Sequence, residues 1–182
     1  TELAKLKDNI VLEIGPGYGF MTDSILERKP KKLYIIEKDK YLVNFLKKKY
    51  FDNKKIVIIE GDILTQKLNK FKNLIVISNL PYNVSTKIIL YLFTFNKNIL
   101  EMVFMMQKEV AEKFDYKINN MNKYKFLTKI MASYFRYFDV SPKVFIPKPK
   151  VQSTVVKFEF KKENIDIDKV HYFSNLIFKN VR

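Results

Sequence analysis

Three of the four glycines in this chain lie in one loop, EIGPGYG, at residues 13–19. Glycine lets a backbone approach a bound molecule closely, and a loop of this kind between a strand and a helix is where doubly wound folds bind nucleotide-like ligands. Dinucleotide enzymes use a similar loop, so the pattern alone leaves a NAD(P) oxidoreductase open. The carboxylate of Glu13 disfavours a pyrophosphate and favours a cationic ligand. S-adenosylmethionine, which carries an ammonium and a sulfonium and no phosphate, fits the loop better.

Acidic residues also follow the next two strands expected along the chain. Glu37 ends a strand, where its carboxylate can accept hydrogen bonds from both ribose hydroxyls, and the alkyl stem of Lys38 would lie near the adenine. After the third strand, Asp62 could accept a hydrogen bond from the adenine amine while Ile63 packs on the ring. Any one of these acids alone is an ordinary solvated strand end. Three acids at the carboxyl ends of three successive strands, two of them beside glycines, favour a single cofactor site.

The tetrapeptide Asn79-Leu80-Pro81-Tyr82 follows the fourth expected strand, on the same rim as the glycine loop. It suits a nucleophile that is an amine conjugated to a ring or a carbonyl, whose lone pair is delocalised. Hydrogen bonds to the Asn79 side-chain oxygen and to the Leu80 carbonyl, held in place by Pro81, would localise that lone pair. Methyl transfer to such an amine depends on position and charge placement more than on a general base. Tyr82 offers a flat face for a base taken out of its stack, although a strand-ending turn with a buried tyrosine is the alternative for the tetrapeptide alone.

The elements that must position these residues alternate between short β-branched strands and amphipathic helices. Strands are expected at residues 9–14, 32–37, 55–60, 73–78 and 100–106. This alternation predicts βαβ units and a parallel sheet that helices cover on both faces. Further on we expect a helix near 125–134, antiparallel strands at 134–140 and 151–160 around a proline-rich loop, and a helix over 168–181. The predicted fold class is α/β, with a Rossmann-like, doubly wound, mostly parallel seven-stranded sheet and an antiparallel end.

The charge balance favours a polyanionic partner. The chain has 34 Lys and Arg against 19 Asp and Glu, a net charge of +15, which favours nucleic acid first and an anionic membrane second. Because the lysines are scattered, a general bias towards lysine is the alternative. Cysteine is absent and His171 is the single histidine, so no metal site is expected. No apolar stretch approaches the roughly 20 residues of a membrane span, and no signal peptide is recognisable, so we expect a cytoplasmic protein without a membrane partner.

Taken in order, several segments resemble the rRNA adenine N6-dimethyltransferases, a family of small-subunit housekeeping enzymes and related large-subunit resistance enzymes. The resemblance covers nearly the whole chain, through VLEIGPGYGFMT, IIEKD, GDIL, ISNLPYNVST, MMQKEVAEKF and FIPKPKVQSTVVKF. It implies a class I S-adenosylmethionine-dependent methyltransferase fold. It also implies two sets of site residues: Glu13, Gly15, Gly17, Glu37, Asp62 and Asn79 around the cofactor, and Asn79, Leu80 and Tyr82 around the target adenine. Phe145, which heads the proline-rich loop, would close the other face of that base, where ~1 to 3 kcal/mol per stacked base is typical; without the resemblance it is equally well a core aromatic.

Two segments, QKEVAEKF at 107–114 and NLPYNVST, are more similar to the bacterial small-subunit enzymes than to the resistance enzymes. The resemblance therefore implies dimethylation of two adjacent adenines in small-subunit rRNA, in the course of ribosome biogenesis, and we expect a monomer. Methylation of large-subunit rRNA stays open as an alternative. So does a non-catalytic nucleic-acid-binding or assembly factor with the same fold.

The expected domain organisation is a catalytic methyltransferase domain at residues 1–162 and the start of a C-terminal helical domain at 163–182. The Gln-Asn-Phe-Leu segment that precedes the first strand in the family is missing, and we expect the C-terminal domain to be truncated. Residues 115–123 depart from the family's glycine-containing loop, and YKFL at 124–127 stands where the family has Tyr-Gly-Arg-Leu. These departures bear on the activity of the chain by itself.

Overall fold

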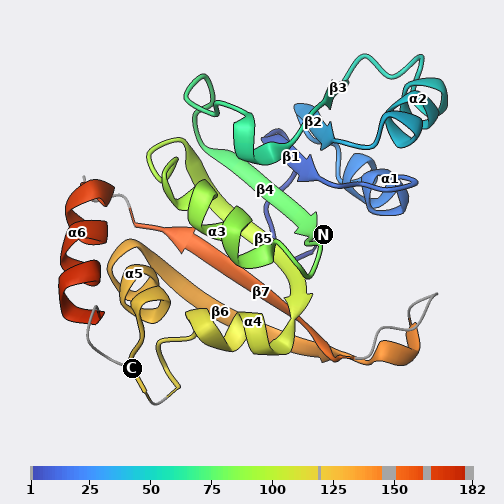
Figure 1. Ribbon diagram of the computed structural model, residues 1–182. Helices are drawn as coiled ribbons and strands as arrows, with labels where there is room; N and C mark the ends of the chain where they lie inside the picture. The colour runs from blue at the N-terminus through green and yellow to red at the C-terminus, as the bar shows by residue number, and fades with distance from the viewer. Residues whose placement is uncertain (1, 119, 145–150, 162–164, 179–182) are drawn as a thin grey trace.

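The computed structural model describes residues 2–118, 120–144, 151–161 and 165–178. These residues form one seven-stranded sheet with the strand order β3-β2-β1-β4-β5-β7-β6 (Figure 1). The strands are β1 Ile10–Ile14, β2 Lys32–Glu37, β3 Ile56–Glu60, β4 Leu74–Asn79, β5 Ile99–Gln107, β6 Ala132–Val140 and β7 Ser153–Phe160. The helices are α1 Phe20–Glu27, α2 Lys40–Lys49, α3 Ser85–Phe93, α4 Lys108–Phe114, α5 Lys123–Met131 and α6 Ile167–Phe178, with short 3-10 turns η1 Ile63–Thr65 and η2 Pro142–Val144.

The first five strands run parallel, and the last two add an antiparallel end. β1 lies between β2 and β4, and all the pairings among β1 to β5 are parallel. β7 pairs antiparallel with both β5 and β6. The doubly wound sheet with an antiparallel end that the sequence predicts is therefore confirmed. The carboxyl ends of β1 to β4 share one edge of this sheet, where α/β folds bind ligands.

Two apolar cores, one on each face of the sheet, explain why the strands read as nearly continuous hydrophobic runs. Val11 belongs to a core with Ile25 of α1 and Leu46 of α2. Its neighbour Leu12 belongs to the other core, with Ile89 of α3. Successive residues of a strand point to opposite faces, so a strand covered on both sides must be apolar at every position. All five side chains are completely buried.

The helix expected near residues 125–134 begins and ends earlier in the structure. Asn122 caps α5, because its side-chain oxygen accepts hydrogen bonds from the backbone N–H groups of Tyr124 (2.8 Å) and Lys125 (3.0 Å). Ala132, at φ −146° and ψ 153°, already pairs with Phe160 of β7. The expected helix end was wrong because pairing with β7 draws residues 132 and 133 into β6. Among the described helices, none combines the length and the hydropathy that a membrane crossing requires.

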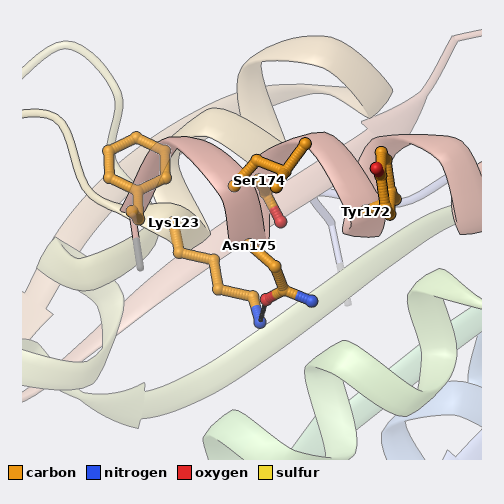
Figure 2. A pocket seen from close by; sticks show the side chains of 6 residues that line it. Lys123, Tyr172, Ser174 and Asn175 are labelled. Atoms are coloured by element: carbon orange, nitrogen blue, oxygen red, sulfur yellow. Dashed lines mark hydrogen bonds between the residues drawn. The ribbon is translucent and has the colours of Figure 1, made fainter. Parts of the chain in front are cut away.

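The last described helix, α6, packs against α5. Figure 2 shows the side chains of Lys123 and Asn175 pointing toward each other, and Lys123 Nζ donates a 2.6 Å hydrogen bond to Asn175 Oδ1. The rings of Phe126 and Phe178 meet edge to face with centroids 5.9 Å apart, and Val170 belongs to the larger core. The segment after residue 164 is thus in contact with the main sheet domain, and the expected domain boundary after residue 162 stays a prediction.

Candidate active site

A cavity of about 220 Å³ opens at the carboxyl ends of β1, β2 and β3. The predicted site residues in its wall are Gly15, Gly17, Glu37, Lys38, Asp62, Ile63 and Pro81, and the other lining residues are Ile14, Ile36, Gly61, Leu64, Val84 and Ile88. Most of the cofactor residues predicted from the sequence therefore share one cavity. Pro81, from the predicted acceptor tetrapeptide, shares it with them.

The backbone of the glycine loop lines this cavity at Gly15 and Gly17, which have no side chains. Gly15 and Gly17 have φ values of 63° and 59°, a region that side chains rarely adopt. A Cβ placed on either glycine would meet nothing within 4 Å. The Gly15 N–H donates a 2.9 Å hydrogen bond to the Ile36 carbonyl, which ties the loop to β2. The loop is thus fixed at one side and leaves room for a ligand at the other.

Glu37 and Asp62 each use one carboxylate oxygen to hold the local backbone. Glu37 Oε1 accepts hydrogen bonds from the N–H groups of Lys38 (2.8 Å) and Asp39 (2.9 Å), and Asp62 Oδ1 accepts one from the Leu64 N–H (2.9 Å). The second oxygen of each carboxylate accepts no hydrogen bond from the residues that the structure describes. Both side chains are therefore oriented and still able to accept a ligand hydroxyl or amine.

Glu13 is not in the cavity wall but lies buried at the end of β1. Thr22 donates a 2.6 Å hydrogen bond to Glu13 Oε2, whereas Oε1 has no hydrogen-bond partner among the described residues. Burial raises the pKa of Glu13 to about 7, and Asp23 adds to the rise, while the Thr22 hydrogen bond and Lys49 oppose it. A buried carboxyl with one unpartnered oxygen suits a donor or cation that arrives with a ligand, and its cofactor role stays a prediction.

The acceptor tetrapeptide begins at the last residue of β4. The Leu80 N–H donates a 2.9 Å hydrogen bond to the Met105 carbonyl, and the Ser78 hydroxyl donates one of 2.7 Å to the Ile14 carbonyl, so the tetrapeptide is fixed to both neighbouring strands. The Asn79 side chain is exposed and makes no hydrogen bond within the described ranges. It lines a second cavity, of about 410 Å³, whose wall comes from β4, β5, β6 and β7 together with α1 and the segment before β1. Asn79, predicted from the sequence to bind both the cofactor and the amine, therefore lines the second cavity and not the first, whereas Pro81 lines the first.

Among the described residues, Tyr82 has one polar side-chain contact, which joins it to the antiparallel end of the sheet. Its hydroxyl lies 2.7 Å from Ser153 Oγ, at the first residue of β7. The ring is half-buried, so it combines a fixed hydroxyl with a partly accessible face. Phe145, predicted to close the opposite face of the base, lies outside the described residues. No group of three His, Asp or Glu side chains in the described part of the chain could hold a metal ion.

A contact between α1 and Tyr50, at the end of α2, supports the last residue of the glycine loop. The sequence did not predict this contact. The Tyr50 hydroxyl lies 2.7 Å from Asp23 Oδ1 and 2.9 Å from the Gly19 carbonyl oxygen, and Lys49 Nζ donates to Asp23 Oδ2 at 2.7 Å. Burial and the neighbouring Asp23 carboxylate raise the pKa of Tyr50. Desolvation works against it, but hydrogen bonds from Lys49 and Tyr50 hold the pKa of Asp23 below its ordinary value. No sequence pattern links Asp23 and Tyr50, which are 27 positions apart. The sequence also did not predict Leu64, Val84 and Ile88 as cavity-lining residues, because their apolar patterns are typical of an ordinary core.

Comparison with known proteins gives sequence relatives that are named as rRNA methyltransferases. A protein named ribosomal RNA small subunit methyltransferase A from Malacoplasma penetrans is 41% identical over 161 residues, which cover 86% of this chain and 57% of the relative. A protein of the same name from Hydrogenobaculum is 35% identical over 100% of this chain and 72% of its own length. The chain thus spans little more than half the length of the Malacoplasma relative.

The matching solved structures agree with the fold. A dimethyladenosine transferase from Plasmodium falciparum superposes with a TM-score of 0.85 at 28% identity, over 98% of this chain and 66% of that one. The 23S rRNA methyltransferase ErmE superposes with a TM-score of 0.83 at 21% identity, over 97% and 72%. These likenesses confirm the class I methyltransferase fold, the fold of S-adenosylmethionine-dependent enzymes, that the resemblance implied. A model of the family described as ribosomal RNA adenine dimethylase matches residues 1–182, and the chain belongs to that family.

Proposed function

We propose that this chain carries the methyl-transfer site of an S-adenosylmethionine-dependent enzyme that dimethylates adenine N6 in small-subunit rRNA during ribosome biogenesis. The observation that carries the proposal is the position of Pro81, which lines the cofactor cavity two residues after Asn79 lines the second cavity. In this proposal one short turn would join the donor site to the amine-binding site. The relatives named as small-subunit enzymes support the choice of rRNA, and we further propose a monomer that works in the cytoplasm.

The residues of the first cavity fit S-adenosylmethionine. The oriented carboxylate of Glu37 would accept the ribose hydroxyls, and Asp62 would accept the adenine amine with Ile63 and Lys38 beside the ring. Gly15 and Gly17 leave space where a Cβ would stand. The unpartnered Oε1 of Glu13 would receive a donor from the charged methionine end. When bound, this cofactor supplies a methyl group on a positively charged sulfur.

The tetrapeptide would prepare the amine. The Leu80 carbonyl is fixed because the Leu80 N–H is bonded to β5, and it accepts no hydrogen bond from the described residues. Together with the exposed Asn79 side chain it offers two acceptors to the two protons of an adenine amine. These hydrogen bonds draw the nitrogen toward a tetrahedral geometry. Its lone pair is then less conjugated with the ring and more localised on the nitrogen, where it can attack the methyl group. The two acceptors also stabilise the positive charge that the nitrogen gains, as in other sites with fixed dipoles.

The target base would be taken out of its stack and placed on Tyr82. The hydroxyl contact with Ser153 fixes the ring, so the base gains stacking energy without the cost of ordering the side chain. Phe145 is proposed for the opposite face of the base. The net charge of +15 would favour association of the chain with the phosphates of rRNA.

The test is to incubate the chain with labelled S-adenosylmethionine and either immature small subunits or protein-free large-subunit rRNA. We expect label in small-subunit RNA, recovered as N6,N6-dimethyladenine after digestion. Asn79→Ala should abolish it while cofactor binding persists, and Asn83→Ala, an exposed asparagine just beyond the tetrapeptide, should not. Label in the large-subunit RNA would favour the resistance-type activity instead. Rapid transfer by Asn79→Ala would refute the mechanism, and cofactor and RNA binding without any transfer would favour a non-catalytic assembly factor.

A further inference from the structure

Five side chains form a continuous exposed strip across the glycine loop and the outer face of α2. The strip consists of Tyr41, Phe45, Tyr18, Lys49 and Phe20. Its aromatic members are exposed to different degrees: Phe20 is 81% exposed, Tyr41 69%, Tyr18 53% and Phe45 37%. Large apolar side chains normally contribute to a core, so several of them gathered on one surface call for a partner.

Helical spacing and direct contacts place the members of the strip next to one another. Tyr41 and Phe45 are four residues apart on α2 and therefore lie on the same face of the helix. The rings of Phe45 and Tyr18 meet edge to face with centroids 5.4 Å apart. Lys49 Nζ donates a 3.2 Å hydrogen bond to the Tyr18 carbonyl and lies 5.9 Å from the centroid of the Phe20 ring. The strip is therefore one surface and not a set of scattered side chains.

The attachment of α2 to the sheet does not need the aromatic side chains of this surface. α2 attaches to the sheet through Val43 and Leu46, which are completely buried, while Tyr41 and Phe45 face away. The hydroxyl groups of Tyr41 and Tyr18 make no hydrogen bond within the ranges that the structure describes. Most of the surface of the Phe20 and Tyr41 rings is exposed to water and does not contribute to the core, so their role is better sought in binding.

The surroundings of the strip are strongly basic. Lys48 lies three residues after Phe45 and seven after Tyr41 on α2, so it shares their face of the helix. It is exposed, as are Lys40 and Lys47 further around α2. Two carboxylates lie nearby, and both already have partners: Asp39 accepts the N–H groups at the start of α2, and Asp23 is bonded to Lys49 and Tyr50. The four lysines of α2, which are Lys40, Lys47, Lys48 and Lys49, outnumber these two carboxylates. The excess charge on this part of the surface is therefore positive, which suits a polyanion and opposes a basic peptide.

The strip also borders the proposed cofactor site. Tyr18 directly follows Gly17, and Asp39, the cap of α2, directly follows Lys38; both Gly17 and Lys38 line the cofactor cavity. A polyanion bound along the strip would therefore reach the edge of the sheet at which the chemistry is proposed to occur.

We propose that the strip binds an unpaired segment of RNA, with bases stacked on Phe20 and Tyr41 and phosphates close to the lysines of α2. Alternating aromatic and cationic groups are what single strands require, because each base has a face to stack and each phosphate a charge to neutralise. In a duplex the base faces are covered by their neighbours, so duplex RNA would gain only the electrostatic part. The proposal rests on the proposed function for its choice of RNA as partner.

The experiment is a fluorescence-anisotropy titration of the whole chain with a labelled single-stranded oligoribonucleotide, and with the same strand annealed to its complement. The test variant is Phe20→Ala/Tyr41→Ala, which removes two exposed rings and no charge. The matched control is Phe51→Ala, since Phe51 is 82% exposed among lysines but is not a member of the strip. We expect the double variant to bind the single strand at least about ten-fold more weakly, to bind the duplex almost unchanged, and to keep its cofactor affinity. The control should stay within about two-fold of the wild type.

Equal single-strand affinity of the wild type and the double variant would overturn the proposal, and methyl transfer by the wild type would then still support the proposed function. Loss of single-strand binding by the double variant, in a chain that never transfers methyl groups to RNA, would support the strip and overturn the proposed function. If sedimentation shows a dimer that only the double variant dissociates, with RNA affinity unchanged, the strip is a contact between copies and the proposal is overturned.

Discussion

The Thr22 hydroxyl donates a 2.6 Å hydrogen bond to one oxygen of the completely buried Glu13 carboxyl, and the other oxygen has no partner among the described residues. Burial raises the pKa of this carboxyl from 4.5 to about 7. The folded protein therefore binds a proton here that the unfolded chain releases between these two values. This contribution to stability is fully present below pH 4.5 and is lost as the pH rises through about 7.

Glu13→Gln should make the stability of the protein less sensitive to pH in this range. The glutamine is neutral at every pH, so no buried charge forms above pH 7. A rise of the pKa to about 7 corresponds to roughly 3 kcal/mol, which is the upper limit of the gain expected for the variant at pH 8. Chemical denaturation at pH 4.5, 6 and 8 measures it; parallel pH curves for the two proteins would contradict the assignment.

Glu37→Ala should weaken S-adenosylmethionine binding by about ten-fold or more. Two backbone N–H groups orient the Glu37 carboxylate, and a hydrogen bond between a charged acceptor and a ligand contributes roughly 1.5 to 3 kcal/mol. The matched control is Glu60→Ala. Glu60 pairs with Glu37 in the register of β2 and β3 but is absent from the cavity wall, so its loss should change the affinity less than two-fold. Isothermal titration gives both affinities, and similar losses in the two variants would show that only the general charge matters.

How far the sequence predicts this site depends on the range of the interactions involved. The strand patterns predict β1 to β4 to within one residue at either end, because a strand buried on both faces must be apolar throughout. In a parallel sheet the carboxyl ends of β1, β2 and β3 lie at the same edge. Gly15, Glu37 and Asp62 stand at or just after these ends, and the structure places them in one cavity. Local patterns were sufficient there.

Contacts that depend on packing between distant elements could not be predicted in this way. Tyr50 reads as the end of an amphipathic helix, yet its hydroxyl supports Gly19 and Asp23. Glu13 reads as a rim carboxylate, yet it is buried against Thr22. In both cases the hydrogen-bond partner depends on how α1 packs on the sheet. The hydrophobic periodicity of one helix does not determine that packing.

Gly17→Ala and Gly19→Ala should separate binding from stability. A Cβ on Gly17 meets nothing within 4 Å, so the cost to folding is the left-handed backbone alone, about 1 to 2 kcal/mol, but the methyl group protrudes toward the cofactor cavity and should weaken cofactor binding. At Gly19, with φ 82°, a Cβ would come within 2.5 Å of the Tyr50 hydroxyl. We expect this variant to lose about 2 to 4 kcal/mol, since the Tyr50 hydrogen bonds break as well.

The double variant Gly19→Ala/Tyr50→Phe provides the control for that clash. Removing the hydroxyl relieves the shortest contact, so the two losses should be smaller together than their sum. Urea denaturation of the four proteins gives the coupling energy. Strict additivity would mean that Tyr50 does not support the loop.

Tyr82 allows the stacking role of the ring to be separated from the role of its hydroxyl. Tyr82→Phe keeps the aromatic face but removes the contact with the buried Ser153 hydroxyl; we expect a loss of roughly 1 kcal/mol in stability and methyl transfer within a few-fold of the wild type. Tyr82→Ala removes the face and should reduce kcat/KM for RNA by about ten-fold or more without changing cofactor affinity. Single-turnover transfer rates and thermal unfolding distinguish the two variants. If the methyl-transfer rate falls as much in Tyr82→Phe as in Tyr82→Ala, the reaction requires the Tyr82 hydroxyl and not the ring. Stacking of the target base on this ring would then be contradicted.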